Sequence, residues 1–174
     1  QDGIEAAVYA VRLAVRTIKQ IQCEIKDIEE RMTESLHKIS YSKQLLSIHG
    51  IGPVSLSIIL GELGDISRYH TAKETLKLAG LNLYEISSGQ QKGRRKISKK
   101  GRPLLRKTVF FAALRMVKTG GAFRQDYLRL TEQNNMHKTK ALVALSRKLL
   151  RIIFALVRDA AMFQHLDPEM DIAA

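Results

Sequence analysis

The stretch that decides the fold is LLSIHGIGPVSLSIILGEL, residues 45–63. Apolar residues on both sides of Gly50-Ile51-Gly52 predict two helices joined by a tight turn, with Pro53 suited to the first position of the second helix. This pattern is typical of the helix-hairpin-helix motif, in which uncovered glycine amides and the positive end of a helix dipole bind a phosphate. Ile51 would hold the turn on the core. A plain corner between two helices is the alternative.

A second informative segment follows at residues 87–101, which read SSGQQKGRRKISKKG. It contains no acid and only one aliphatic residue, so it cannot form part of a core, and we expect an irregular basic loop. A run of charges is most often a solvated face. The bases of this segment and of the helix expected after it are Lys92, Arg94, Arg95, Lys96, Lys99, Lys100, Arg102, Arg106 and Lys107.

The charge of the whole chain is strongly polarised. The 174 residues carry a net charge of +12, but residues 87–160 alone hold nineteen bases and three acids. Such a field predicts a polyanionic partner. Nucleic acid fits better than a membrane surface, because the basic segment has no apolar face for lipid. We therefore expect the nine bases and the Gly50-Ile51-Gly52 turn to bind nucleic acid.

Composition limits the class of protein. With 45% hydrophobic residues the chain can build a core, and we expect one domain with an extension. It has no apolar run long enough to span a membrane and no secretory leader, so we expect a cytoplasmic protein. Its only cysteine, Cys23, excludes an internal disulfide, and we expect it to fill a packing position. Because the sequence starts with Gln, we expect a fragment of a longer protein.

The N-terminal segment, residues 1–40, predicts one long helix. Ile18, Ile21, Ile25, Ile28 and Met32 recur at spacings of three and four residues, between charged flanks. This pattern favours a coiled coil that forms a homo-oligomer, with a dimer expected. An amphipathic helix packed on its own domain is the alternative.

The rest of the chain predicts a mainly α fold. We expect a compact helical domain at residues 41–165, containing the helix-hairpin-helix motif and the basic loop, and an acidic tail at 166–174. Residues 81–86 are extended in character and can pair with the stretch near Lys96-Ile97 as a short β-hairpin. A last helix is expected at 138–163, stopped by Asp167-Pro168. Its bases either stay solvated or follow the same polyanion; they are Arg147, Lys148, Arg151 and Arg158.

The sequence contains residues that bear on three kinds of catalytic site. The five histidines lie far apart in the sequence, and no carboxylate cluster suits a two-metal nuclease, so we expect no metal site on this chain. Tyr127 lacks the arginines that a nucleophilic tyrosine needs. Ser87 and Ser88 sit among cations that could neutralise a phosphodiester, but no base lies beside them in sequence. They are either nucleophiles or residues that cap a turn or hydrogen-bond a phosphate.

An ordered set of short motifs resembles the C-terminal domain of insertion-sequence transposases of the IS110/IS116 type. These motifs are Gly50-Ile51-Gly52-Pro53, Gly64-Asp65, Leu78-Ala79-Gly80-Leu81, Ser88-Gly89, Ile97-Ser98-Lys99-Lys100-Gly101, Leu105-Arg106 and residues 140–150. The N-terminal helix resembles the coiled coil that precedes this domain in the family.

The resemblance implies a function for the basic loop. It implies that Ser88, with Ser87 as the fallback, is a nucleophile that forms a covalent phosphoserine link to DNA. It further implies an N-terminal ribonuclease-H-like domain, outside this sequence, whose acids bind Mg²⁺, so that this chain holds only part of a composite active site. A structured guide RNA, and a cytoplasmic, nucleoid-associated location in a bacterium or archaeon, are also implied.

Overall fold

The computed structural model describes residues 2–85, 95–118 and 120–164, and it confirms a mainly α fold. The hairpin predicted between residues 81–86 and 96–97 is present as two short antiparallel strands. In chain order the elements are α1 (Asp2–His37), α2 (Ser42–Leu46), α3 (Pro53–Leu63), a 3₁₀ turn η1 (Ile66–Arg68), α4 (Ala72–Leu78), β1 (Leu83–Glu85), β2 (Arg95–Ile97), α5 (Pro103–Lys118), α6 (Arg124–Leu128), a π-helical turn η2 (Arg129–Gln133) and α7 (Lys138–Arg158).

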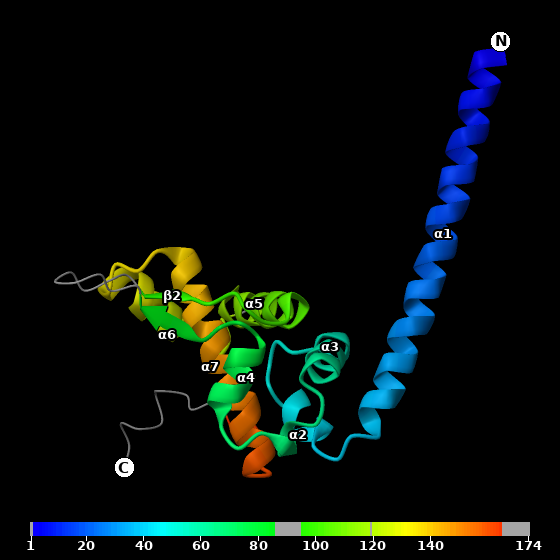
Figure 1. Ribbon diagram of the computed structural model, residues 1–174. Coiled ribbons are helices and arrows are strands. Elements are labelled where there is room, and N and C mark those ends of the chain that lie inside the picture. Colours follow the sequence, from blue (N-terminus) through cyan, green and yellow to red (C-terminus); the bar gives the residue numbers. More distant parts are fainter. Residues whose placement is uncertain (1, 86–94, 119, 165–174) are drawn as a thin grey trace.

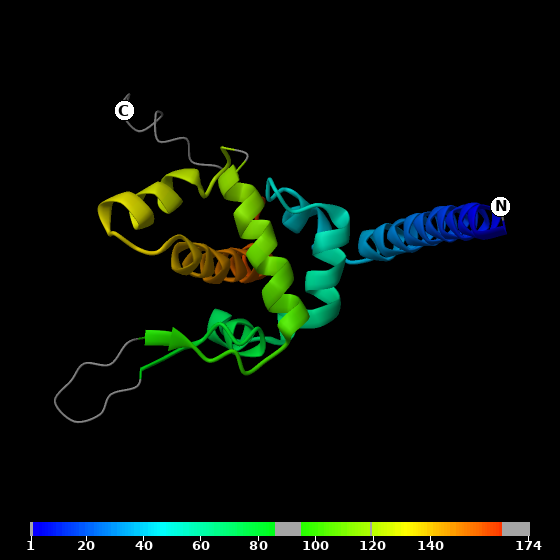
Figure 2. The same ribbon diagram turned by 90° about the horizontal axis from the view of Figure 1, so that it is seen from above.

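The core of the domain lies where α5 and α7 cross, with α3 on the other side of α5 and α4 against α7 (Figures 1 and 2). α7 is amphipathic, and its apolar face is fully buried at Leu145, Leu149 and Leu150. α5 contributes Leu105, Val109 and Met116, which are also fully buried. Removing this much apolar surface from water is the main term that stabilises the domain.

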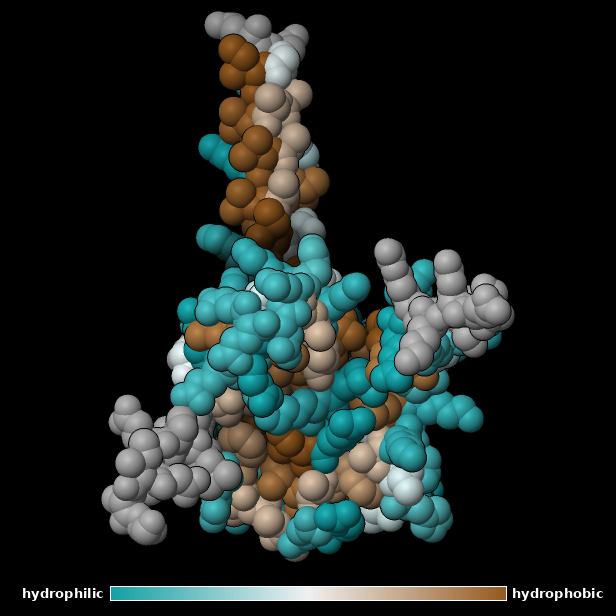
Figure 3. Space-filling model, turned by 90° about the vertical axis from the view of Figure 1, so that its left-hand side faces the viewer, coloured by the Kyte–Doolittle hydropathy of each residue, from teal (hydrophilic) through white to brown (hydrophobic). Residues whose placement is uncertain are grey.

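α1 projects away from this core as a single helix of 36 residues (Figure 1). Only its last turns touch the domain: Leu36 is buried, and the Ser57 hydroxyl of α3 donates a hydrogen bond to the Met32 carbonyl at 3.2 Å. The apolar stripe of the helix stays about half exposed, including Ile18, Ile25 and Ile28. Figure 3 shows this stripe as a brown band along the projecting helix. The alternative of a helix packed on its own domain is therefore wrong for most of its length.

Two smaller expectations are corrected by the structure. Cys23 is exposed on α1, so it fills no packing position within the chain. The last helix ends at Arg158 rather than near residue 163, because Ala160 adopts φ +50° and reverses the chain. The amides of Ala160 and Ala161 bond back to the carbonyls of Val157 and Leu156, which is the Schellman arrangement that ends many helices.

No helix among the described residues is long and apolar enough to cross a membrane.

Candidate nucleic-acid interface

The base of the hairpin is built from pairing that extends one residue beyond the strands. Leu83 lies opposite Ile97 and Glu85 opposite Arg95. Beyond them, the Ser98 amide donates to the Asn82 carbonyl at 2.9 Å, and the Ser98 hydroxyl donates to the Asn82 side-chain oxygen. A two-stranded ribbon is marginally stable alone. These extra bonds therefore matter for fixing where its two strands leave the domain.

Arg106, on the first turns of α5, joins the hairpin base to the end of α4. Its guanidinium donates to the Ala79 carbonyl at 3.0 Å and to the Lys99 carbonyl at 3.2 Å. Ala79 follows α4, and Lys99 follows β2, so one half-buried side chain links three elements. Hydrogen bonds from a charged group are stronger than neutral ones. The sequence predicted Arg106 as a nucleic-acid contact, but the structure gives it bonds within the protein.

Gly101 and Arg102 close the same junction. Gly101 has φ +155°, and a side chain there would overlap the Leu78 carbonyl and the backbone between α4 and Gly80. The Arg102 amide donates to the Leu78 carbonyl at 2.7 Å, and its guanidinium reaches the Glu62 carbonyl at the end of α3, also at 2.7 Å. A cation at a helix C-terminus is favourable because the carbonyls there carry partial negative charge.

The remaining predicted bases of the described residues point to solvent. Lys96, Lys99, Lys100 and Lys107 are exposed and make no ion pair with described residues, whereas Arg95 pairs with Glu85 at 3.3 Å. Lys107 and Arg106 also line a groove of about 420 Å³ between the hairpin, α5 and α7, whose walls are mainly apolar. Four uncompensated lysines around the hairpin base thus offer a cationic surface to a polyanion.

Several predicted site residues lie outside the described residues. These are Ser88, its fallback Ser87, Lys92 and Arg94. What the structure does place are the two ends of their segment, at Glu85 and Arg95, which face each other across the hairpin.

The Gly50-Ile51-Gly52 turn lies far from the hairpin base. Gly50 has φ +101°, and a side chain on it would come within 2.8 Å of the Met116 side chain. Because Met116 and Arg106 are ten residues apart on one helix, the turn and the hairpin base contact α5 about 15 Å apart along its axis. Figure 2 shows them near opposite ends of α5. The structure therefore does not bring the two predicted phosphate sites together.

The turn does place a helix N-terminus at the surface. Ile51 is 5% exposed and anchors the turn in the core, as expected from its place between two glycines. No side chain caps α3, which begins at Pro53. The Arg115 guanidinium of α5 donates to the Ser55 hydroxyl at 3.2 Å, so a cation lies beside this first turn.

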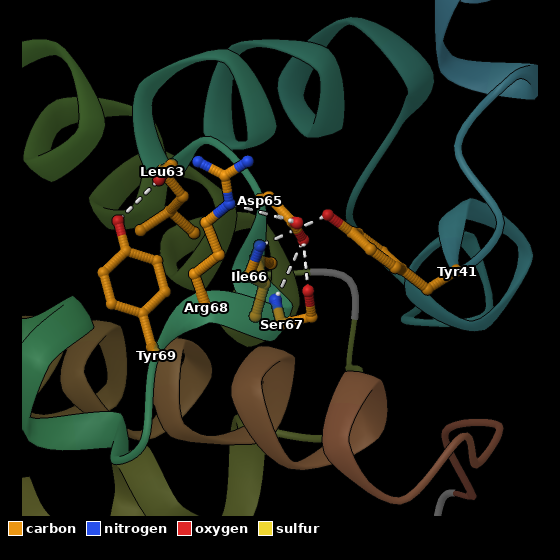
Figure 4. Close-up of polar contacts among 7 residues, drawn as sticks. All are labelled: Tyr41, Leu63, Asp65, Ile66, Ser67, Arg68 and Tyr69. Atoms are coloured by element: carbon orange, nitrogen blue, oxygen red, sulfur yellow. Dashed lines mark hydrogen bonds and ion pairs between the residues drawn. The ribbon is translucent and has the colours of Figure 1, made fainter.

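Asp65 has a local role in the structure. Its carboxylate accepts hydrogen bonds from the Ser67 hydroxyl at 2.7 Å and the Ser67 amide at 3.0 Å, and it pairs with Arg68 at 3.5 Å (Figure 4). The hydrogen bonds from Ser67 lower the pKa of Asp65. Tyr41 lies on the other side of the carboxylate, and burial together with the charge of Asp65 raises the pKa of its hydroxyl. The carboxylate thus caps η1.

The described residues contain no group of three or more His, Cys, Asp or Glu side chains that could hold a metal ion.

Comparison with known proteins gives the family. The model of the Transposase IS116/IS110/IS902 family matches residues 42–128, which is half of the chain. The chain belongs to this family. The match spans the segment from α2 to α6 and includes the hairpin and its clamp to α5.

Individual relatives agree with this assignment. The chain is 26% identical to the IS900 uncharacterized 42 kDa protein of Mycobacterium paratuberculosis, over 91% of this chain and 39% of that protein. It is 31% identical to the pilin gene-inverting protein of Moraxella bovis, over 84% of this chain and 45% of that protein. It is 30% identical to the transposase for insertion sequence element IS1111A of Coxiella burnetii, over 76% of this chain and 37% of that protein. The chain thus spans about two fifths of the length of the curated relatives it matches.

Two contributors to the site were missed in the sequence. Asn82 and Ser98 were not identified, because the predicted pairing carried no register; the observed register, with Leu83 opposite Ile97, brings residues 82 and 98 together. The role of Arg106 as a clamp left no signal, because its partners are main-chain carbonyls, which every sequence contains.

Proposed function

We propose that this chain is the serine-nucleophile domain of a DNA transposase, which cuts and rejoins strands through a covalent phosphoserine link at Ser88. The observation that carries the proposal is the family match over residues 42–128, which in sequence includes Ser88 and the clamped, cationic hairpin base on both sides of its segment. Since the chain spans only part of its relatives, the activity proposed is that of a longer protein.

The proposed chemistry is a pair of transesterifications. The Ser88 oxygen attacks the phosphorus of a DNA phosphodiester, the Oγ–P bond forms, and one bridging P–O bond breaks. The serine proton leaves to a base outside this chain, and the departing DNA oxygen is protonated to a hydroxyl. A hydroxyl of the joining strand then attacks the same phosphorus and releases Ser88. The number of phosphodiesters is conserved, so no energy source is needed.

The described residues would assist by electrostatics and by position. Lys96, Lys99 and Lys100 lie near the hairpin base and would lower the cost of bringing a phosphate to the serine. The bonds of Arg106 and Asn82 would fix the direction in which the hairpin leaves the domain. Orientation of a nucleophile is a large part of catalysis, since small misplacements cost rate.

Further partners are part of the proposal. The half-exposed stripe of α1 would pair with a second copy of the chain as a coiled coil. A structured guide RNA would direct the complex, and Mg²⁺ would bind acids of a separate domain rather than this chain. Such a protein would act in the cytoplasm, at the nucleoid.

A second candidate is a helix-hairpin-helix module that grips nucleic acid and forms no covalent bond. It is favoured by the uncapped N-terminus of α3, which has a surface glycine turn before it and Arg115 beside it. In that case binding would depend on Gly52 and Arg115, and Ser88→Ala would be silent.

The deciding experiment is to trap the covalent intermediate. The chain is joined to its proposed acidic domain and incubated with Mg²⁺, guide RNA and DNA carrying a suicide nick, and adducts are resolved on a denaturing gel. We expect a DNA–protein adduct that is lost in Ser88→Ala and kept in Ser87→Ala. An adduct kept in Ser88→Ala, or no adduct while DNA binding is unchanged, would reject the nucleophile and favour the binding module.

A further inference from the structure

The bases of α7 fall into two groups. Lys140, Arg147, Arg151 and Arg158 are spaced by seven, four and seven residues, and at 3.6 residues per turn they lie on one edge of the helix. The other two bases, Lys138 and Lys148, lie on other faces. This edge lies on the solvent side of α7 and spans most of its length.

The structure neutralises some of these bases and leaves others uncompensated. Arg158 forms a bidentate pair with Asp159, at 2.7 and 2.9 Å. Lys148 pairs with Asp126 of α6. Arg147, Arg151 and Lys140 make no ion pair with any described residue. Two adjacent arginines one turn apart repel each other, which costs stability unless an anion binds them.

Arg147 is also held in place. Its side chain is half-buried, and its Nε atom is fully buried with no hydrogen-bond partner. A buried donor without a partner costs about 1–3 kcal/mol. Burial and the neighbouring Arg151 lower the pKa of this guanidinium, which agrees with a charge that lacks an anion. The stem of Arg147 is therefore fixed by packing, while part of its head remains exposed.

The hairpin base lies against the same half of α7 that carries Lys140 and Arg147. Val143 and Ser146 of α7 line the same groove as Ile97, Arg106 and Lys107, so the first half of α7 lies beside the hairpin. Arg147 follows Ser146, and Arg151 lies one turn further, about 6 Å along the axis. That distance is close to two nucleotide steps, at about 3.4 Å each along duplex DNA.

We propose that Lys140, Arg147 and Arg151 form a second binding site for the phosphate backbone of DNA, which carries the duplex along α7 away from the hairpin. This rests on the proposed function, in that the DNA is the one brought to Ser88. Arg147 and Arg151 are the central contacts, since arginine matches phosphate geometry with two parallel hydrogen bonds. Arg158 is excluded, because Asp159 occupies its guanidinium.

The test compares two arginines on the same edge of the same helix. Arg151→Gln removes an unpaired base, and Arg158→Gln removes a paired one, so the two variants change charge and side chain identically. Duplex DNA binding by the full chain is titrated from 0.1 to 1 M salt. We expect Arg151→Gln to reduce the log–log salt slope by about 0.9, which is about eightfold in affinity across this range. Arg158→Gln should leave the slope unchanged.

Two further arms make the result decisive. Arg147→Gln should lower the salt slope by the same amount, and circular dichroism confirms that this variant folds. If Arg147→Gln does not fold, the exposed Arg151 alone carries the test through Arg151→Gln. Equal slopes for Arg151→Gln and Arg158→Gln would overturn the proposal. A slope change with structured RNA but not with duplex DNA would also overturn it. The adduct assay with Ser88→Ala is an independent measurement. If no Ser88-dependent adduct forms but Arg151→Gln still lowers the salt slope of DNA binding, only the proposed function is rejected.

Discussion

Arg106 donates a hydrogen bond to the main-chain carbonyl of Lys99 at 3.2 Å, and this contact fixes the end of the hairpin on the first turns of α5. Lys99 adopts φ +56°, which is unfavourable for a residue with a side chain. The guanidinium therefore holds a strained residue at the point where the basic segment rejoins the domain. Strain of this kind persists only where surrounding contacts determine it.

Arg106→Ala should destabilise the domain by about 1–3 kcal/mol, because it removes the Nη1 donor that bonds to both the Ala79 and the Lys99 carbonyls. The measurement is urea unfolding followed by circular dichroism. Lys107→Ala is the matched control, since Lys107 is the exposed neighbour and its side chain makes no hydrogen bond or ion pair with any described residue. Equal midpoints for the two variants would show that Arg106 is not a clamp.

Gly101→Ala should cost about 1–3 kcal/mol from backbone strain alone, with more from the overlap with the Leu78 carbonyl. Gly61→Ala provides the control, because a methyl group on this α3 residue meets nothing within 4 Å. It should stabilise the protein by about 0.5–1 kcal/mol, since alanine favours the helix. Thermal unfolding of both variants gives the comparison, and a Gly101→Ala protein as stable as the wild type would contradict the packing described here.

Asp65 predicts a specific dependence of stability on acid pH. Its pKa is lower in the folded than in the unfolded chain, where it is about 3.9. The stabilisation is therefore present above that unfolded value, and it is lost as the pH falls through the folded pKa. Asp65→Asn keeps an acceptor for Ser67 but cannot titrate, so its unfolding midpoint should fall less steeply below about pH 4. If the unfolding midpoints of the wild type and of Asp65→Asn fell equally as the pH is lowered, Asp65 would not be the group responsible.

Ile25→Asn should convert a dimer into a monomer without lowering the stability of the domain. Ile25 is half exposed on the projecting part of α1, and a polar residue there would be buried in a coiled-coil seam. Sedimentation equilibrium gives the mass, and the Cys23→Ser variant controls for a change at a neighbouring exposed position of the helix. A monomeric wild-type chain would reject pairing through α1.

The predictable part of the fold came from local patterns. Three such features depend only on neighbours in the chain, and each is present in the structure. They are the apolar period of residues 18–32, the Gly-Ile-Gly turn before Pro53 and the short paired stretch near Ile97. The end of the last helix was placed wrongly, because Ala160 gives no sequence signal for a left-handed conformation.

For the candidate site too, one part could be predicted from the sequence and another could not. Charge is a property of the sequence, so the concentration of bases in residues 87–160 could be recognised from the composition of that segment. Which base is available for a phosphate could not be recognised, because it depends on distant partners: Arg102 bonds to Glu62, Arg106 to Ala79, and Lys148 to Asp126.

By itself, therefore, the sequence determined the helical class, the long amphipathic N-terminal helix and the polarity of the charge, since these follow from periodicity and composition. Only the tertiary structure decided that α1 projects from the domain, that the glycine turn and the hairpin base lie near opposite ends of α5, and that Arg106 is a clamp. It also decided that Arg147 and Arg151 form no ion pair with the residues described. The physical reason is that hydrogen bonds and ion pairs act over a few ångströms, and packing alone decides which groups, remote in the chain, come that close.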